Sequence, residues 1–108
     1  MSIERGSGNV FADLGFKNAD EMLAKAKLVH AISQAMESRG VTQTELAQLA
    51  GVDQSKVSKL MRGKTDGFSS DRLLRILNRL DQDVEIIISP RPMTENREAQ
   101  VSIVMTTR

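Results

Sequence analysis

Hydrophobic residues recur at intervals of three and four along residues 19–80, and the interval changes to two beyond residue 84. The first helix is predicted at residues 19–38, where apolar positions form a stripe along one face. Asn18 is expected to act as its N-cap, and Arg39-Gly40 suits a C-terminal end. The predicted stripe comprises Met22, Ala26, Leu28, Val29, Ile32, Ala35 and Met36.

Two short helices joined by a tight turn are predicted next. Thr42 and Glu45 have the spacing of a capping box, in which the threonine hydroxyl and the glutamate carboxylate cap each other's backbone amides. The first of these helices must be short, because Gly51 follows its apolar residues closely. Asp53 is expected to cap the second helix, over residues 53–62. Its predicted buried side consists of Val57, Leu60 and Met61.

The last predicted helix spans about residues 70–80, with Ser69 as its N-cap. Arg72, Arg75 and Arg79 form a basic stripe on its outer side. A solvated face is the favoured interpretation of this stripe, and a contact with phosphate or a protein partner is the alternative. The predicted buried side consists of Leu73, Leu74, Ile76, Leu77 and Leu80.

The C-terminal part of the chain has the period of β-strands. Two β-branched runs, residues 84–89 and 101–105, predict a two-stranded antiparallel element. Both strands would be apolar on both sides, because Ile87 and Val104 alternate with other apolar residues. A lone pair of strands is marginal, so one face is expected to cover the helices and the other to pair with a second copy. The predicted dimer interface comprises Val84, Ile86, Ile87, Ile88, Val101, Ile103 and Val104.

Length and composition limit the other possibilities. A chain of 108 residues has room for one domain, which we divide into an N-terminal arm with a short docked helix (1–18), a helical domain (19–81) and the β segment (82–108). The absence of cysteine excludes disulfides and thiolate metal sites and fits a cytoplasmic protein. No apolar run approaches a membrane span of about 18 residues.

No catalytic constellation is recognisable in the sequence. His30 is the only histidine, and neither a Gly-rich phosphate loop nor a pair of carboxylates in a plausible cleft accompanies it. A half-exposed position on the first helix is the expected role of His30. Glu95 and Glu98 are expected only to solubilise a polar connection. We therefore predict that the protein is not an enzyme and uses no metal or cofactor.

The net charge of +1 is unevenly distributed along the chain. Residues 54–64 contain no acidic residue, although they carry several cations on a short helix and the loop after it. Such a local surplus is typical of a surface that meets an anionic partner. The cations are Lys56, Lys59, Arg62 and Lys64.

The stretch VTQTELAQLAGVDQSKVSKLMRGK, residues 41–64, fills the helix-turn-helix pattern without a gap. With Gln43 as the first position, Ala47 is a small residue where the helices approach, and Gly51 provides the positive φ of the turn. The stretch resembles the DNA-binding domains of the Cro/cI (xenobiotic-response-element, XRE) repressor family, and the resemblance covers about residues 19–80. It implies a mainly α, lambda-repressor-like domain of four or five helices.

The resemblance and the chemistry of the side chains give the predicted contacts with double-stranded DNA. The family's base-reading positions fall on the outer face of the 53–62 helix, where Gln suits adenine and Lys suits guanine. Candidates for base edges are Gln54, Ser55, Ser58 and Lys59, although Ser58 could face DNA without touching it. Candidates for phosphates are Thr42, Gln43, Lys56, Arg62 and Lys64, of which Lys56 and Lys64 could equally be solvated.

Two functions remain open at this point. The first is a homodimeric repressor that reads a pseudo-palindromic operator through two recognition helices about 34–36 Å apart. The second follows from NVFADLGF and GFSSDRLLRILNRLDQDVEI, which resemble the short antitoxin-like (HigA-type) members of the family. This resemblance implies neutralisation of a RelE-like ribonuclease toxin, with autorepression as feedback. The toxin site is then expected before Phe16 or after Arg91.

Overall fold

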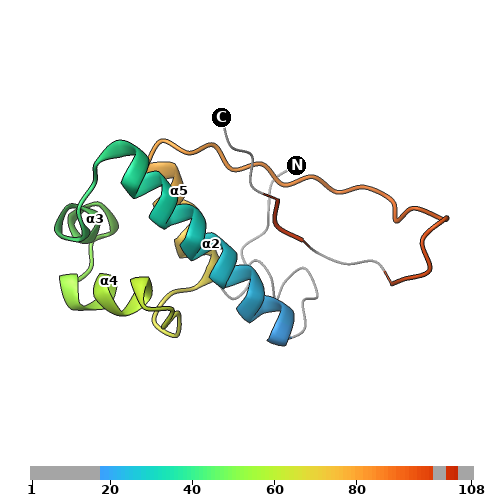
Figure 1. Ribbon diagram of the computed structural model, residues 1–108, viewed down its shortest axis with the longest axis horizontal. Helices are drawn as coiled ribbons and strands as arrows, with labels where there is room; N and C mark the ends of the chain where they lie inside the picture. Colours follow the sequence, from blue (N-terminus) through green and yellow to red (C-terminus); the bar gives the residue numbers. More distant parts are fainter. Residues whose placement is uncertain (1–17, 99–101, 105–108) are drawn as a thin grey trace.

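Helices form all the regular secondary structure of the described residues, and their order is α2 (Asn18–Arg39), α3 (Gln43–Ala50), α4 (Gln54–Met61) and α5 (Ser70–Arg79) (Figure 1). The computed structural model describes residues 18–98 and 102–104. Apart from Asn18, the predicted N-terminal arm lies outside the described residues. Asn18 lies within α2, so the prediction that it is the N-cap was wrong.

The helices pack in two pairs around an aliphatic core. α2 lies against α5 and α3 against α4, while contacts of α3 with α5 and of α2 with α4 join the pairs. Each helix contributes a side chain with no exposed area: Ile32, Leu46, Leu60 and Leu73. Burying one such side chain stabilises a fold by about 1.5–3 kcal/mol, so these four positions fix how the helices are placed relative to one another.

All four helices end in the same hydrogen-bonded motif. Just beyond each helix, one residue takes a left-handed backbone conformation. The amide of the residue after it donates a hydrogen bond to the carbonyl five residues earlier, for example from Val41 to Met36 at 2.9 Å. Glycine occupies the left-handed position after α2, α3 and α4, but Asp81 occupies it after α5, with φ at 60°. The Asp81 carboxylate pairs with the Arg39 guanidinium at 2.8 Å, which joins the C-terminal ends of α2 and α5.

The apolar stripe predicted along the first helix is only partly correct. Its C-terminal part is buried, but Met22 is 64% exposed and Ala26 is exposed as well. The first turns of α2 project beyond α4 and α5 (Figure 1), so residues there can follow the helical period without contacting the bundle. In the last helix, Leu74 is half-buried and not fully buried as predicted.

The two predicted strands are not formed in the described residues. Residues 84–89 leave α5 as an extended segment that reaches away from α3 and α4 before the chain turns back (Figure 1). Ile87 is 77% exposed and Ile88 66% exposed. The prediction fails within one chain because a strand requires a hydrogen-bonding partner, and a pair of isolated strands is marginal in water.

Near the C-terminal end of the described chain, burial alternates from one residue to the next as the sequence predicts. Ile103 is half-buried and packs against the helical core, whereas its neighbour Val104 is 83% exposed. The other members of the predicted interface are exposed in part, with Val84 at 38% and Ile86 at 42%. Val101 lies outside the described residues.

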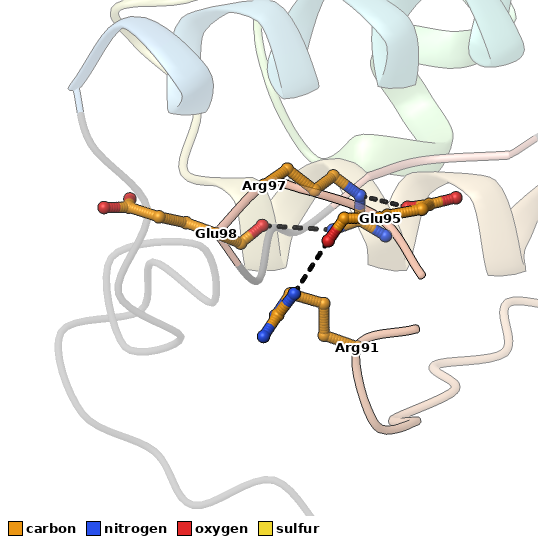
Figure 2. A network of polar contacts seen from close by, with 4 residues as sticks. All are labelled: Arg91, Glu95, Arg97 and Glu98. Atoms are coloured by element: carbon orange, nitrogen blue, oxygen red, sulfur yellow. Dashed lines mark hydrogen bonds and ion pairs between the residues drawn. The ribbon is translucent and has the colours of Figure 1, made fainter. Parts of the chain in front are cut away.

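Polar contacts around Glu95 organise the turn between these two apolar segments (Figure 2). The Glu95 carbonyl accepts a hydrogen bond from Arg91 at 2.9 Å, and its carboxylate accepts one from Arg97 Nε. Arg97 Nη1 also donates to the Glu98 carbonyl at 3.1 Å. Glu95 and Glu98 therefore take part in the local structure of this turn, beyond the solubilising role predicted for them.

Candidate nucleic-acid interface

The turn between α3 and α4 depends on Gly51. Its backbone is left-handed, with φ 68° and ψ 36°, and the following amide of Val52 donates to the Ala47 carbonyl at 3.0 Å. A Cβ added to Gly51 would meet no atom within 4 Å, so the requirement for glycine is conformational and not steric. The small residue at the approach of the two helices is Ala47, which is buried.

The start of α3 contains the predicted capping box. The Thr42 hydroxyl accepts from the Glu45 amide at 3.1 Å, and the Glu45 carboxylate accepts from the Thr42 amide at 3.0 Å. The hydrogen bond from the Thr42 backbone amide to the Glu45 carboxylate, and secondly an interaction of that carboxylate with the Thr42 hydroxyl, lower the pKa of the Glu45 carboxyl below its ordinary value. The Thr42 and Gln43 side chains are both exposed.

α4 is held in a fixed rotation by its buried side. Val57 and Leu60 are buried in the core, and the half-buried Met61 accepts a hydrogen bond from Ser33 of α2 at 3.4 Å. Asp53 takes the N-cap position with an extended backbone, but its side chain makes no capping hydrogen bond, contrary to the prediction. Burial of these apolar side chains, rather than a side-chain cap, therefore anchors α4.

The opposite face of α4 is open to solvent. Gln54, Ser55 and Lys59 are exposed, and Ser58 is half-buried. These four side chains carry donors and acceptors of the kinds that pair with base edges. The fold thus brings every predicted base-contact residue onto one helix and leaves the face that carries them uncovered.

The predicted phosphate contacts fall at two places. Thr42 and Gln43 lie at the start of α3, whereas the cations lie on α4 and just after it, and all of them are exposed: Lys56, Arg62 and Lys64. In the described part of the chain, no carboxylate pairs with these three cations or with Lys59. The surface around α4 is therefore positively charged without internal neutralisation.

The three arginines of α5 have different surroundings. Arg75 pairs with Asp71 at 3.1 Å one helical turn earlier, and Arg79 is exposed. Arg72 is half-buried, and its guanidinium lies 5.5 Å from the centre of the Phe68 ring. Lys56 lies on the same ring at 5.9 Å. This cluster could not be predicted from the sequence, because Lys56 on α4 and Arg72 on α5 meet at the Phe68 ring only in the tertiary fold.

Other kinds of site find no support among the described residues. Within residues 18–98 and 102–104, no group of three or more His, Asp or Glu side chains lies close enough to hold a metal ion. His30 is exposed, rather than half-exposed as predicted. In the same ranges, no helix combines the length and the hydropathy needed to cross a membrane.

Comparisons with known proteins identify the fold and the family. A family model described as a helix-turn-helix domain matches residues 10–89. A solved structure named "Putative XRE Family Transcriptional Regulator" is similar to this chain, with 37% sequence identity and a TM-score of 0.76. The match covers 83% of this chain and 100% of the other. A comparison with curated proteins gave no match. The chain therefore belongs to the helix-turn-helix family of DNA-binding domains, and it is similar to an XRE-family transcriptional regulator.

Proposed function

We propose that the protein is a homodimeric repressor that binds a pseudo-palindromic operator by placing α4 in the major groove. The observation that carries this proposal is the outer face of α4, which is polar, cationic and uncovered, while the opposite face is buried in the core. A helix that served only to fill the core would gain nothing from such a face. DNA requires it, because base edges need donors and acceptors and phosphates need cations.

The side chains of this surface divide into two groups. Gln54 can pair with the edge of an adenine through the two polar atoms of its amide, and Lys59 can donate to a guanine through its ammonium group. Ser55 and Ser58 add hydroxyls beside them. Thr42, Gln43, Arg62 and Lys64 are proposed to bind phosphates. The exposure of all four side chains, and the absence of a carboxylate paired with Arg62 or Lys64 in the described residues, support this division.

The C-terminal segment is proposed to join two copies. A single helix-turn-helix makes few contacts, so two half-sites about 34–36 Å apart require a dimer. In one chain the backbone of residues 84–89 is extended and its apolar side chains are exposed. Pairing with the same segment of a second copy would satisfy that backbone and bury those side chains around a two-fold axis.

The dimer is tested by placing a charge in this segment. Ile87→Asp should give monomers in analytical ultracentrifugation and weaken operator binding, because an unpaired carboxylate is costly to bury in the interface between two copies. Val104→Asp should act in the same way. The matched control is Thr94→Asp, which adds the same charge at an exposed polar position of the same segment. An Ile87→Asp protein that sediments as an unchanged dimer would refute this interface.

Repression itself is tested on the protein's own promoter. A footprint should protect two half-sites in successive major grooves just upstream of the gene, and a reporter fused to this promoter should be expressed more strongly without the protein. Protection of a single half-site, or unchanged reporter activity, would contradict the proposal.

The second candidate function is that of an antitoxin. The exposed apolar side chains of the C-terminal segment favour a protein partner, and Met93, which is 95% exposed, lies outside the segment assigned to the dimer. The partner implied by the resemblance is a RelE-like ribonuclease toxin. Co-expression with the product of the neighbouring gene should yield a stable complex, and Met93→Glu should weaken it. A neighbour that is not a small basic protein would dismiss this function.

A further inference from the structure

Phe68 joins α4 and α5 through two cations on its ring. The ring is 3% exposed and lies in the loop just before α5. Lys56 of α4 and Arg72 of α5 reach the same ring from different helices, with Nζ at 5.9 Å and Cζ at 5.5 Å from its centre. The Lys56 stem also lies across Gly67, since a Cβ added there would be 3.5 Å from Lys56 Cε. Arg72 is half-buried, and the exposed Lys56 side chain lies along Gly67 and the Phe68 ring.

This pair of like charges has no carboxylate to neutralise it within the described residues. Arg75, one turn along the same helix as Arg72, does have one in Asp71. The electron-rich face of an aromatic ring attracts cations, and this attraction opposes the repulsion between the two charges. A third group that carries negative charge would complete the cluster.

The position of Lys56 decides what that group is. In the helical period, Lys56 precedes Leu60 by one turn, so it lies at the edge of the buried side of α4 and not on the outer face with Ser55 and Lys59. With the outer face of α4 in the major groove, as proposed above, a side chain at this edge would lie beside the sugar-phosphate backbone that borders the groove rather than at base edges. Arg72 offers a planar set of donors that suits a phosphate.

We propose that Phe68 is a positioning residue that holds Lys56 and Arg72 together as a phosphate-binding pair at the edge of the DNA-binding surface. The inference rests on the proposed function and adds Arg72 to the residues that contact DNA. It also separates Lys56 from Lys64, because only Lys56 is held in place before DNA binds.

Arg72→Met tests the charge, because methionine keeps an apolar chain over Phe68. The matched control is Arg79→Met, which removes the same charge from the exposed end of α5. Binding is measured by fluorescence anisotropy at several salt concentrations, on a duplex from the protein's own promoter and on an unrelated duplex. Arg72→Met should weaken binding to both duplexes equally. It should also reduce the steepness with which the logarithm of the association constant falls with the logarithm of the salt concentration, by about 0.9. The factor by which Arg72→Met binds more weakly than the wild type should therefore shrink about threefold between 50 and 200 mM salt.

A double-mutant cycle tests the role of Phe68. Phe68→Leu keeps a buried apolar side chain and removes the aromatic face, so it should weaken binding in the wild-type background. It should have no further effect in the Lys56→Met/Arg72→Met background, whereas a residue that only maintains the fold would weaken binding in both. Thermal unfolding of each variant verifies that it is folded.

The outcomes separate this inference from the proposed function. A wild-type protein that binds neither duplex would overturn both. A wild-type protein that binds its promoter, together with Arg72→Met equal to Arg79→Met in affinity and salt slope, would overturn the phosphate pair alone. An equal effect of Phe68→Leu in the two backgrounds would overturn the positioning role.

Discussion

Gly51→Ala probes the conformation on which the orientation of α4 depends. A left-handed backbone costs a residue with a Cβ roughly 1–2 kcal/mol, and alanine recovers about 0.4–1 kcal/mol by restricting the unfolded chain. No steric term is added, because a Cβ at this position meets nothing within 4 Å. The net destabilisation should therefore be about 1 kcal/mol, which for a domain of this size lowers Tm by roughly 4–8 °C.

Thermal and urea unfolding measure this change against two controls. Gly67→Ala should be neutral or slightly stabilising, because Gly67 does not have a positive φ and the nearest atom, Lys56 Cε, would be at an ordinary contact distance of 3.5 Å. Gly51→Asn should lose less stability than Gly51→Ala, because asparagine tolerates the left-handed region. A Gly51→Ala protein as stable as Gly67→Ala would refute the assignment of this turn to backbone conformation.

Other predictions concern charge. Lys59→Ala should cost about 1–3 kcal/mol of operator affinity and relax the preference at one base pair, whereas Lys64→Ala should weaken binding to all duplexes alike. Equal losses of affinity on every sequence for both variants would invalidate the division into base and phosphate contacts. The lowered pKa of Glu45 means that its capping interaction is fully present above the ordinary carboxyl pKa and is lost as the pH falls through the lowered one. Glu45→Gln should therefore be less stable than the wild type at pH 7, and melting curves recorded down to pH 3 should converge; a constant difference would contradict this reasoning.

The sequence predicted the helical part of the fold well because helix limits are set by neighbouring residues. The capping box of Thr42 and Glu45 and the left-handed turn at Gly51 lie where they were predicted. Met22 and Ala26 show the limit of such reasoning. Their spacing is correct for a buried stripe, but burial also depends on whether a partner helix extends that far, and this is not encoded in the spacing.

The predicted strands and the Phe68 cluster depend on distant parts of the chain, and they could not be predicted in the same way. Alternation in residues 84–89 indicates an extended backbone, which the structure has, but pairing requires a second strand that the described residues do not supply. Phe68 and Lys56 lie twelve positions apart in the sequence and meet only through the tertiary fold. For the candidate site, the exposed face of α4 followed from its period, whereas the surroundings of Arg72 did not.

The composition of α4 suggests a compromise between stability and binding. α3 and α5 each have an acidic residue in the first turn, which favours a helix electrostatically, but α4 has none, and Asp53 provides no capping hydrogen bond. Gln54→Glu should therefore stabilise the free protein by about 0.3–1 kcal/mol. The same carboxylate would face the phosphates of bound DNA, so operator affinity should fall even though the melting temperature rises. Gln48→Glu, at an exposed position of α3 away from the start of a helix, is the control for added charge. If Gln54→Glu raised the melting temperature without loss of affinity, the start of α4 would not lie against DNA.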